Sequence, residues 1–254
     1  MRDFYTEFYL AVLHSQAHHI FCELVFGKDL CQHGFADLEQ LQLLMDVTGL
    51  GPQHHALDLG CGNGMISEYL SDRTDAHVIG LDFIPEAIRQ ACLRTSAKAE
   101  RLTFMVGDIN HLELHPNTFD VILSIDSIYF SQDYALTIKQ LKDALKHGGQ
   151  MAFLYSYGRE PWVPEEAFPK EKLPPERTPL AEALAANALA FQTWDLTRQD
   201  YALARRRKEV LTELKSQFEA EGAMFIYNNR KGDAEGISQA VEESLHARYL
   251  YHVR

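Results

Sequence analysis

Hydrophobic positions near the start of the chain follow the spacing of helices. Over residues 3–26 apolar side chains recur every three or four positions, and Gly27 can end the run, so this segment predicts a single helix. Residues 37–48 repeat the spacing, with Asp37 in the N-cap position and Gly49 as the stop. We therefore expect two helices before the rest of the fold begins.

The spacing changes at His55, where short apolar runs begin to alternate with helical stretches. The runs have the length of buried strands, and they cover residues 55–59, 77–81, 102–106, 120–125 and 150–156. The helical stretches between them cover residues 63–71, 85–97 and 133–146. Strands that alternate with helices in this way predict a parallel sheet and hence an α/β fold.

The last hundred residues are more varied. The segment from Gly158 to Pro179 holds most of the prolines among charged residues, which predicts an exposed excursion. The elements expected after it are helices at about 180–189 and 233–245, a long polar helix ending near 220, and strands at 191–195 and 248–253.

Composition narrows the class of protein. The chain has 254 residues, of which 46% are hydrophobic and 24% charged, so it can build a packed core. Its formal net charge is −12, and no basic face offsets this charge, so the electrostatic footprint of a nucleic-acid binder is missing. The basic run Arg205–Lys208 lies among acidic residues and is expected to be a solvated helix face. A small acceptor fits better, and the negative charge of the protein is compatible with a cationic one.

Cysteine usage and the N-terminal residues bear on the compartment. The four cysteines have no CxxC spacing, so we expect neither a metal site nor a disulfide framework, and a reducing cytoplasm is the natural location. Charge interrupts residues 1–5 too early for a signal peptide, and no apolar run approaches membrane length. We expect no membrane contact.

The clearest chemical signal lies where the first expected strand meets the next helix. Asp58 stands between apolar residues and is followed by the glycine-rich run 60–64, Gly-Cys-Gly-Asn-Gly. Glycines let the backbone turn sharply and approach a ligand, while the following helix offers free N–H groups. This arrangement indicates a nucleotide-like ligand. The dinucleotide fingerprint GxGxxG, however, needs its third glycine where Met65 stands, so the pattern is GxGxG instead.

With these residues the sequence resembles the class I S-adenosylmethionine-dependent methyltransferases, whose first motif is an apolar strand, Asp, an apolar residue and Gly-x-Gly-x-Gly. The family's second motif, an acidic residue that ends strand two, is matched by Asp82, about 20 residues after the loop, where it can bind both ribose hydroxyls. The third, which in the family faces the adenine, is matched by Asp108. Strands four and five also match, at residues 119–124 and 148–153, so the resemblance spans residues 55–156.

The resemblance implies a Rossmann-like sheet, mostly parallel with an antiparallel C-terminal strand. It implies S-adenosylmethionine as cofactor and S-adenosylhomocysteine as product. The residues expected at the cofactor are Asp58, Gly60, Cys61, Gly62, Asp82, Phe83, Asp108, Ile109 and Ser124. Two have a structural alternative, since Asp82 could cap the helix that begins at Pro85 and Asp108 could be a turn residue.

The acceptor side is marked more loosely. Residues 32–34, Gln-His-Gly, resemble a His-x-Gly element that lies near the methionine end of the cofactor in small-molecule methyltransferases, although a structural histidine is the alternative. Asp126 and His33 are the candidates for a base that takes the acceptor's proton. Tyr129 and Phe130 follow strand four, where the family borders its acceptor pocket, and they are either pocket or core aromatics.

Three further patterns limit the acceptor. The Asn/Asp-Pro-Pro-aromatic stretch of enzymes that methylate nucleic-acid amines is missing at residues 126–130, and no carboxylate cluster suited to a metal is legible, so we expect no metal. Tyr5 and Tyr9 are expected on a helix packing face, with a reach into the pocket as the alternative.

We therefore expect a single domain, residues 1–254, that transfers a methyl group to an N or O nucleophile of a small molecule. Its expected parts are an N-terminal helical cap (1–50), a cofactor-binding core (55–156), a lid or insertion (157–190) and the C-terminal part of the sheet with its helices (191–254). Two other functions remain open. One is a catalytically silent methyltransferase-like protein that binds the cofactor, and the other is an NAD(P)-dependent oxidoreductase. A monomer and a homodimer fit equally well.

Overall fold

A single seven-stranded sheet forms the centre of the computed structural model, which describes residues 2–160 and 162–254. Its strand order is β3-β2-β1-β4-β5-β7-β6. The first five strands are parallel, and β7 runs antiparallel to both of its neighbours, β5 and β6. The strands are β1 (His55–Leu59), β2 (His77–Asp82), β3 (Leu102–Val106), β4 (Phe119–Ile125), β5 (Leu145–Gly158), β6 (Phe191–Asp195) and β7 (His246–Val253). The expected Rossmann-like sheet with an antiparallel C-terminal strand is confirmed.

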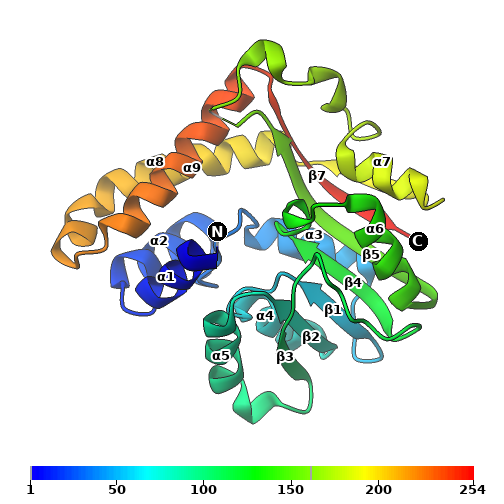
Figure 1. Cartoon of the computed structure of the whole chain (residues 1–254). Coiled ribbons are helices and arrows are strands. Elements are labelled where there is room, and N and C mark those ends of the chain that lie inside the picture. Colours follow the sequence, from blue (N-terminus) through cyan, green and yellow to red (C-terminus); the bar gives the residue numbers. More distant parts are fainter. Residues whose placement is uncertain (1, 161) are drawn as a thin grey trace.

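Helices cover both faces of this sheet, and a further group lies beside it (Figure 1). The helices are α1 (Arg2–Val12), α2 (Gln16–Phe26), α3 (Leu38–Thr48), α4 (Met65–Thr74), α5 (Pro85–Arg94), α6 (Tyr134–Ala144), α7 (Pro179–Ala186), α8 (Thr197–Ala220) and α9 (Met224–Glu242). The cap expected for α3 is present, since the Asp37 side chain accepts a hydrogen bond from the Gln40 N–H and Gly49 ends the helix in the left-handed conformation.

Successive residues of each strand point to opposite faces, so the apolar runs feed two separate cores. Ala56 and Leu123 pack with residues of α3, α4 and α5, whereas Leu57 and Ile122 pack with residues of α6 and α7. All four side chains are completely buried. Such near-continuous apolar strands are typical of a parallel sheet that is covered on both faces.

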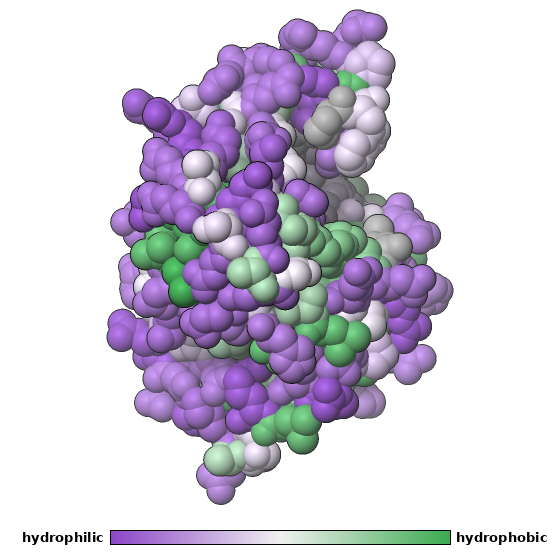
Figure 2. All heavy atoms as spheres, turned by 90° about the vertical axis from the view of Figure 1, so that its left-hand side faces the viewer, coloured by the Kyte–Doolittle hydropathy of each residue, from purple (hydrophilic) through white to green (hydrophobic). Residues whose placement is uncertain are grey.

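A third apolar cluster joins α1 and α2 to the long hairpin of α8 and α9, which extends to the left of the sheet in Figure 1. Phe8 of α1, Phe21 of α2 and Phe218 of α8 are fully buried in it. Figure 2 views the molecule from this side, where the surface is mostly hydrophilic, in keeping with a charge of −12, and is notched at the right. Of these helices, α1 forms one side of the cavity described below.

The single helix expected over residues 3–26 is wrong, because the chain breaks between α1 and α2. Ser15 caps α2 by accepting a hydrogen bond from His18 N–H, and its hydroxyl donates to Glu221 at the end of α8. Glu221 also accepts from the Ala17 N–H, so it closes the start of α2 and does not face the cavity. The apolar spacing continues across the break, which is why the pattern concealed it.

Helix α9 is longer than the expected 233–245, since it begins at Met224. Its residues 224–232 are mostly polar or aromatic and carry a weak apolar period, and a helix start there is hard to recognise. The extra turns bring Phe225 and Asn229 against α1 and the loop that carries His33.

The expected lid at 157–190 is only partly an excursion. Helix α7 packs Leu180 and Leu184 onto the sheet beside α6, and Thr178 is buried against Tyr251 of β7. The irregular part is residues 159–160 and 162–172, with short 3-10 turns at Glu165–Ala167 and Lys170–Lys172. The prolines ahead of α7 shape its entry, and Pro179 occupies its first turn.

Arg207 also departs from expectation. Arg205 and Arg206 are exposed as predicted, but Arg207 is only 2% exposed and its guanidinium lies over the rings of Phe26 and Phe35. It falls on the same helical stripe as Leu203 and Val210, so the period of 3.6 turns one residue of the basic run inward. Within the described residues, no helix is long and apolar enough to cross a membrane.

Candidate active site

A cavity lies at the carboxyl ends of β1, β2 and β4, where the strand order reverses between β1 and β4. Open α/β sheets bind ligands at this topological switch point. The cavity encloses about 860 Å³ of space between protein atoms, part of it open to solvent, which suits a small molecule. Its walls come from the glycine loop, the ends of β2 and β4, α1 and residues 30–34.

The glycine loop adopts a conformation that side chains would obstruct. Its turn is held by the N–H groups of Gly60 and Cys61, which both donate to the Leu81 carbonyl, at 2.7 and 3.1 Å. Gly62 has φ +57°, and a Cβ there would lie 2.3 Å from the Tyr9 hydroxyl. The glycines are therefore required both by the left-handed backbone and by the close approach of α1.

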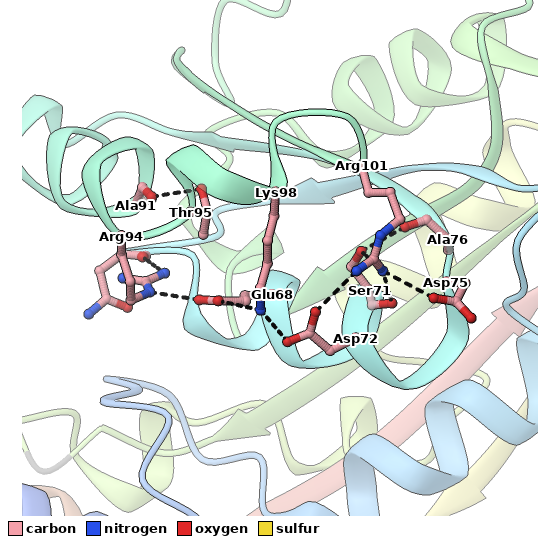
Figure 3. Close-up of polar contacts among 11 residues, drawn as sticks. Glu68, Ser71, Asp72, Asp75, Ala76, Ala91, Arg94, Thr95, Lys98 and Arg101 are labelled. Carbon is pink, nitrogen blue, oxygen red and sulfur yellow. Dashed lines mark hydrogen bonds and ion pairs between the residues drawn. The ribbon is translucent and has the colours of Figure 1, made fainter.

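An ion-pair network fixes the helix that follows this loop (Figure 3). Arg94 of α5 binds Glu68 of α4 at 2.7 Å, and Lys98 binds both Glu68 at 2.8 Å and Asp72 at 2.5 Å. Arg94 also donates to the Asn63 carbonyl at 2.8 Å, which ties the loop itself to α5. The loop is thus anchored from its outer side before any ligand binds.

Asp82 lines the cavity at the end of β2 and is 8% exposed. Its carboxylate accepts hydrogen bonds from the N–H groups of Gly62 at 2.8 Å and Ile84 at 2.9 Å. Burial raises its pKa, and these two donors oppose that rise. Asp82 is not the N-cap of α5, which is Ile84, so the capping alternative is wrong. The carboxylate instead joins the glycine loop to β2 at the cavity wall.

Asp58 lies behind the cavity rather than on its wall. It is 2% exposed, and Ser67 of α4 donates to it at 2.6 Å. Burial raises the pKa of this carboxyl from 3.8 to about 6, against the hydrogen bond from Ser67, and the charge of Asp82 adds to the rise. The position of Asp58 therefore does not support direct contact with a cofactor.

Ser124, which was expected to contact the cofactor, also lies behind the cavity wall. It is fully buried at the end of β4 and hydrogen-bonds to the Ser127 hydroxyl at 2.6 Å. Ser127 in turn donates to the Leu59 carbonyl and does line the cavity. The two serines join the ends of β1 and β4 beneath the glycine loop.

Asp108 takes the turn role that was left open for it. Its side chain is 49% exposed and accepts from the N–H and the side-chain amide of Asn110, at 2.9 and 3.1 Å. It does not line the cavity, whereas its neighbours Gly107 and Ile109 do, as does Phe83 after β2. The positions of Ile109 and Phe83 are thus compatible with cofactor contact, whereas Asp108 lies outside the lining.

The hydrogen-bond partners of Asp126 do not suit the predicted role of a base. Its carboxylate forms a bidentate pair with Arg248 of β7, at 2.5 and 3.1 Å, and accepts from the Phe35 N–H at 2.7 Å. The Asp126 and Arg248 side chains are 1% and 0% exposed. Both oxygens of this carboxylate are already engaged by Arg248 and the Phe35 N–H, so the geometry gives Asp126 the role of a buried ion pair in the cavity wall rather than that of a base.

His33 and Tyr129 lie at the same end of the cavity. His33 lines it, and its ring packs against Tyr5 and Phe8 with centroids 4.9 and 4.8 Å apart. Burial and the charge of Arg230 hold its pKa well below the usual range, so the ring is neutral. Tyr129 packs against Phe130 just outside the lining, and burial raises its pKa. Neutral His33 is a weak proton acceptor, and Tyr129 keeps its proton.

Several lining residues were not expected from the sequence. Both Tyr5 and Tyr9 of α1 line the cavity, which is the alternative that had been kept open for one of them. Ser127, Asn63 and Cys31 were missed, because polar or small residues in loops carry no period that would mark them. All four cysteines are free, and among residues 2–160 and 162–254 no group of three or more His, Cys, Asp or Glu could hold a metal.

The sheet order, the glycine loop at its switch point and the acidic residue at the end of β2 define a Rossmann-like methyltransferase domain. A family model described as "Methyltransferase domain" matches residues 50–188, more than half of the chain, so the chain belongs to this methyltransferase family. The resemblance noted from the sequence is thereby confirmed.

Curated relatives and solved structures agree with this assignment. Phosphoethanolamine N-methyltransferases of Triticum aestivum and Arabidopsis thaliana are 32% identical over 146 residues, 58% of this chain. The chain spans less than a third of their length, 28% and 29%.

Solved structures show the same fold at low sequence identity. Haemonchus contortus phosphoethanolamine N-methyltransferase 2, in complex with phosphomonomethylethanolamine and S-adenosylhomocysteine, has a TM-score of 0.75 at 18% identity, covering 96% of this chain and 58% of that one. A putative sarcosine dimethylglycine methyltransferase from Galdieria sulphuraria has a TM-score of 0.68 at 19% identity, covering 85% of this chain and 84% of that one.

Proposed function

We propose that this chain binds S-adenosylmethionine in the cavity and transfers its methyl group to a nucleophilic nitrogen or oxygen of a small molecule. The observation that carries the proposal is Asp82, a buried carboxylate that ends β2, lines the cavity and accepts a hydrogen bond from the glycine loop. A carboxylate in this position can accept hydrogen bonds from ribose hydroxyls. The relative from Haemonchus contortus binds S-adenosylhomocysteine, which supports the same ligand here.

The reaction asks little covalent chemistry of the protein. The sulfonium already activates the methyl group, so the site must bring a nucleophile into line with the S–CH₃ bond and exclude water. Aromatic faces in the lining, from Tyr5, Tyr9, Phe83 and Phe130, are suited to a cationic sulfonium. Among the described lining residues there is no Lys or Arg that would repel it.

Calorimetric titration with S-adenosylhomocysteine, S-adenosylmethionine and NADH tests the cofactor. We expect both sulfur compounds to bind and NADH not to bind. Binding of NADH alone would favour the oxidoreductase alternative and overturn the proposal.

A radiolabelled-methyl screen over amines, phenols, carboxylates and RNA tests the transfer. We expect label in a small molecule. Cofactor binding with no transfer to any of these classes would favour the catalytically silent alternative, and label in RNA alone would contradict a small-molecule acceptor.

A further inference from the structure

The loop that carries His33 is fastened to α9 by one buried arginine. Arg230 is 2% exposed, and its guanidinium donates hydrogen bonds to the carbonyls of Gln32, at 2.5 Å, and His33, at 2.7 Å. The same group lies 3.0 Å from Nε2 of His18 on α2, and burial holds the pKa of this ring well below its usual range, so the neutral imidazole can accept. Gln32, His33 and Gly34 all line the cavity. Arg230 therefore supports the cavity wall from outside the lining.

Packing alone does not explain an arginine at this position. Among the described residues, the acceptors of Arg230 are all neutral, two carbonyls and one imidazole. Its guanidinium carbon lies 5.0 Å from the centre of the Phe8 ring and 5.8 Å from that of the Phe21 ring. Taking a charge out of water is costly, and an apolar side chain of similar size could fill the space between these rings without that cost. The hydrogen bonds to the loop are what only an arginine supplies.

The two carbonyls that Arg230 binds belong to consecutive peptides, and this fixes the direction of their N–H groups. The described peptide bonds are all trans, so each C=O points opposite to the N–H of the same peptide. The N–H groups of His33 and Gly34 are therefore turned away from the guanidinium. Neither has an acceptor among the described residues, whereas the next N–H, of Phe35, donates to Asp126. Consecutive N–H groups that point the same way form a concavity suited to an anion.

The glycine loop, by contrast, has already used most of its N–H groups. Gly60 and Cys61 donate to the Leu81 carbonyl, and Gly62 donates to Asp82. The carboxylate of Asp82 also disfavours a second carboxylate on this side of the cavity. Since no Lys or Arg is present among the described lining residues, the carboxylate of a ligand depends on backbone donors elsewhere in the wall.

A guanidinium on the carbonyl side of a peptide polarises it and strengthens its N–H as a donor. We propose that Arg230 is a positioning residue for the cofactor, which holds the loop so that the N–H groups of His33 and Gly34 bind the carboxylate of S-adenosylmethionine. This assignment rests on the proposed function. Arg230 itself touches no ligand and acts through the backbone. Its planar fork is required, because a single ammonium group cannot hold two carbonyls in one fixed geometry.

The test compares Arg230→Lys with Arg207→Lys as the matched control. Arg207 is equally buried, at 2% exposure, but its guanidinium lies over the rings of Phe26 and Phe35, and its nitrogens have no hydrogen-bond partner among the described residues. Calorimetry would measure the binding of S-adenosylhomocysteine and of decarboxylated S-adenosylhomocysteine, which lacks only the carboxylate. Amide NMR of the parent protein would follow the two loop N–H signals during both titrations.

We expect Arg230→Lys to weaken the affinity for S-adenosylhomocysteine about tenfold. Its affinity for the decarboxylated compound should equal that of the parent, which also reports correct folding. Arg207→Lys should bind both compounds as the parent does. In the parent, the N–H signals of His33 and Gly34 should shift with S-adenosylhomocysteine and not with the decarboxylated compound.

An equal loss of affinity for both compounds in Arg230→Lys would show that the arginine has a structural role alone. That result, or an unchanged affinity for S-adenosylhomocysteine, would overturn the assignment. Loop N–H signals in the parent that respond equally to both compounds would also overturn it, and this measurement decides the matter even where Arg230→Lys does not fold. Failure of S-adenosylhomocysteine to bind the parent protein would overturn the proposed function itself.

Discussion

The two ends of the cavity differ in how their polar groups are satisfied. At the glycine loop Asp58, Asp82, Ser124 and Ser127 all have protein partners. At the opposite end, His33 packs against the rings of Tyr5 and Phe8 and lies beside Asn229 of α9. The difference teaches that the glycine-loop end is held mainly by hydrogen bonds within neighbouring motifs, whereas the His33 end is held mainly by aromatic packing between distant segments.

The largest expected effect on stability comes from the ion pair between Asp126 and Arg248 in the cavity wall. Asp126→Asn leaves a fully buried guanidinium without its counter-charge, so we expect a loss of about 3–5 kcal/mol in the free energy of unfolding. Urea denaturation measures it. Asp143→Asn is the control, because it breaks the exposed pair with Lys139 and should change stability by about 1 kcal/mol or less. Unchanged stability with abolished methyl transfer would restore Asp126 as a base.

Substitution of Asp58 should change the free energy of unfolding in the opposite direction, towards higher stability. The pKa of its carboxyl is about 6 when folded against an ordinary 3.8, so the folded state binds the proton more tightly and stability falls as pH rises from about 4 to 6. Asp58→Asn removes this penalty while it keeps a partner for Ser67. We expect it to be more stable than the parent by about 2–3 kcal/mol at pH 8, with the gain vanishing near pH 4. A gain that is equal at both pH values would contradict the assigned cause.

Asp82→Ala tests the cofactor side directly. Loss of charge-assisted hydrogen bonds to a bound ribose should weaken the affinity for S-adenosylhomocysteine by about 1.5–3 kcal/mol, roughly 10- to 100-fold. Calorimetry measures the change. Glu113→Gln, a change to an exposed carboxylate, is the control and should bind normally. Equal affinity in Asp82→Ala would show that the ribose does not lie at the end of β2.

The smallest expected effect comes from two glycine substitutions. Their comparison separates the cost of a left-handed backbone from the cost of a steric clash. Gly62 and Gly49 have nearly the same φ, +57° and +56°, but a Cβ meets Tyr9 at Gly62 and nothing within 4 Å at Gly49. Gly49→Ala should lose only the cost of a left-handed residue, about 1–2 kcal/mol of stability, and keep its affinity for S-adenosylhomocysteine. Gly62→Ala should lose more stability and also affinity. Identical behaviour of the two variants would show that the contact between α1 and the loop is unimportant.

The cofactor side was predictable because its signals are local. The strand, the glycine run and Asp82 follow one another within 28 residues, and each position has a backbone or charge requirement that only a few residue types meet. Asp58, Ser124 and Asp108 were assigned to direct contact from the same motifs. Whether a side chain faces the ligand or the layer behind it depends on packing, which the motif does not encode.

The His33 end of the cavity was not predictable because it is built from distant segments. Tyr5 and His33 come together only through the packing of α1 against the loop at residues 30–34. Asp126 was misassigned as a base for the same reason, since its partner Arg248 lies 122 residues away. A pairing between residues so far apart leaves no local pattern in the sequence. From the sequence alone, Arg248 could not be distinguished from any other polar residue of a strand.

The position of β7 has a consequence for the synthesis of this protein. The last strand in the chain does not lie at an edge of the sheet but between β5 and β6, and it carries the arginine that neutralises Asp126. A nascent chain that has emerged as far as β6 therefore has a gap in its sheet and an uncompensated carboxylate in the wall of its cavity. Because domains generally fold as units, β7 must have been synthesised before the native sheet can close.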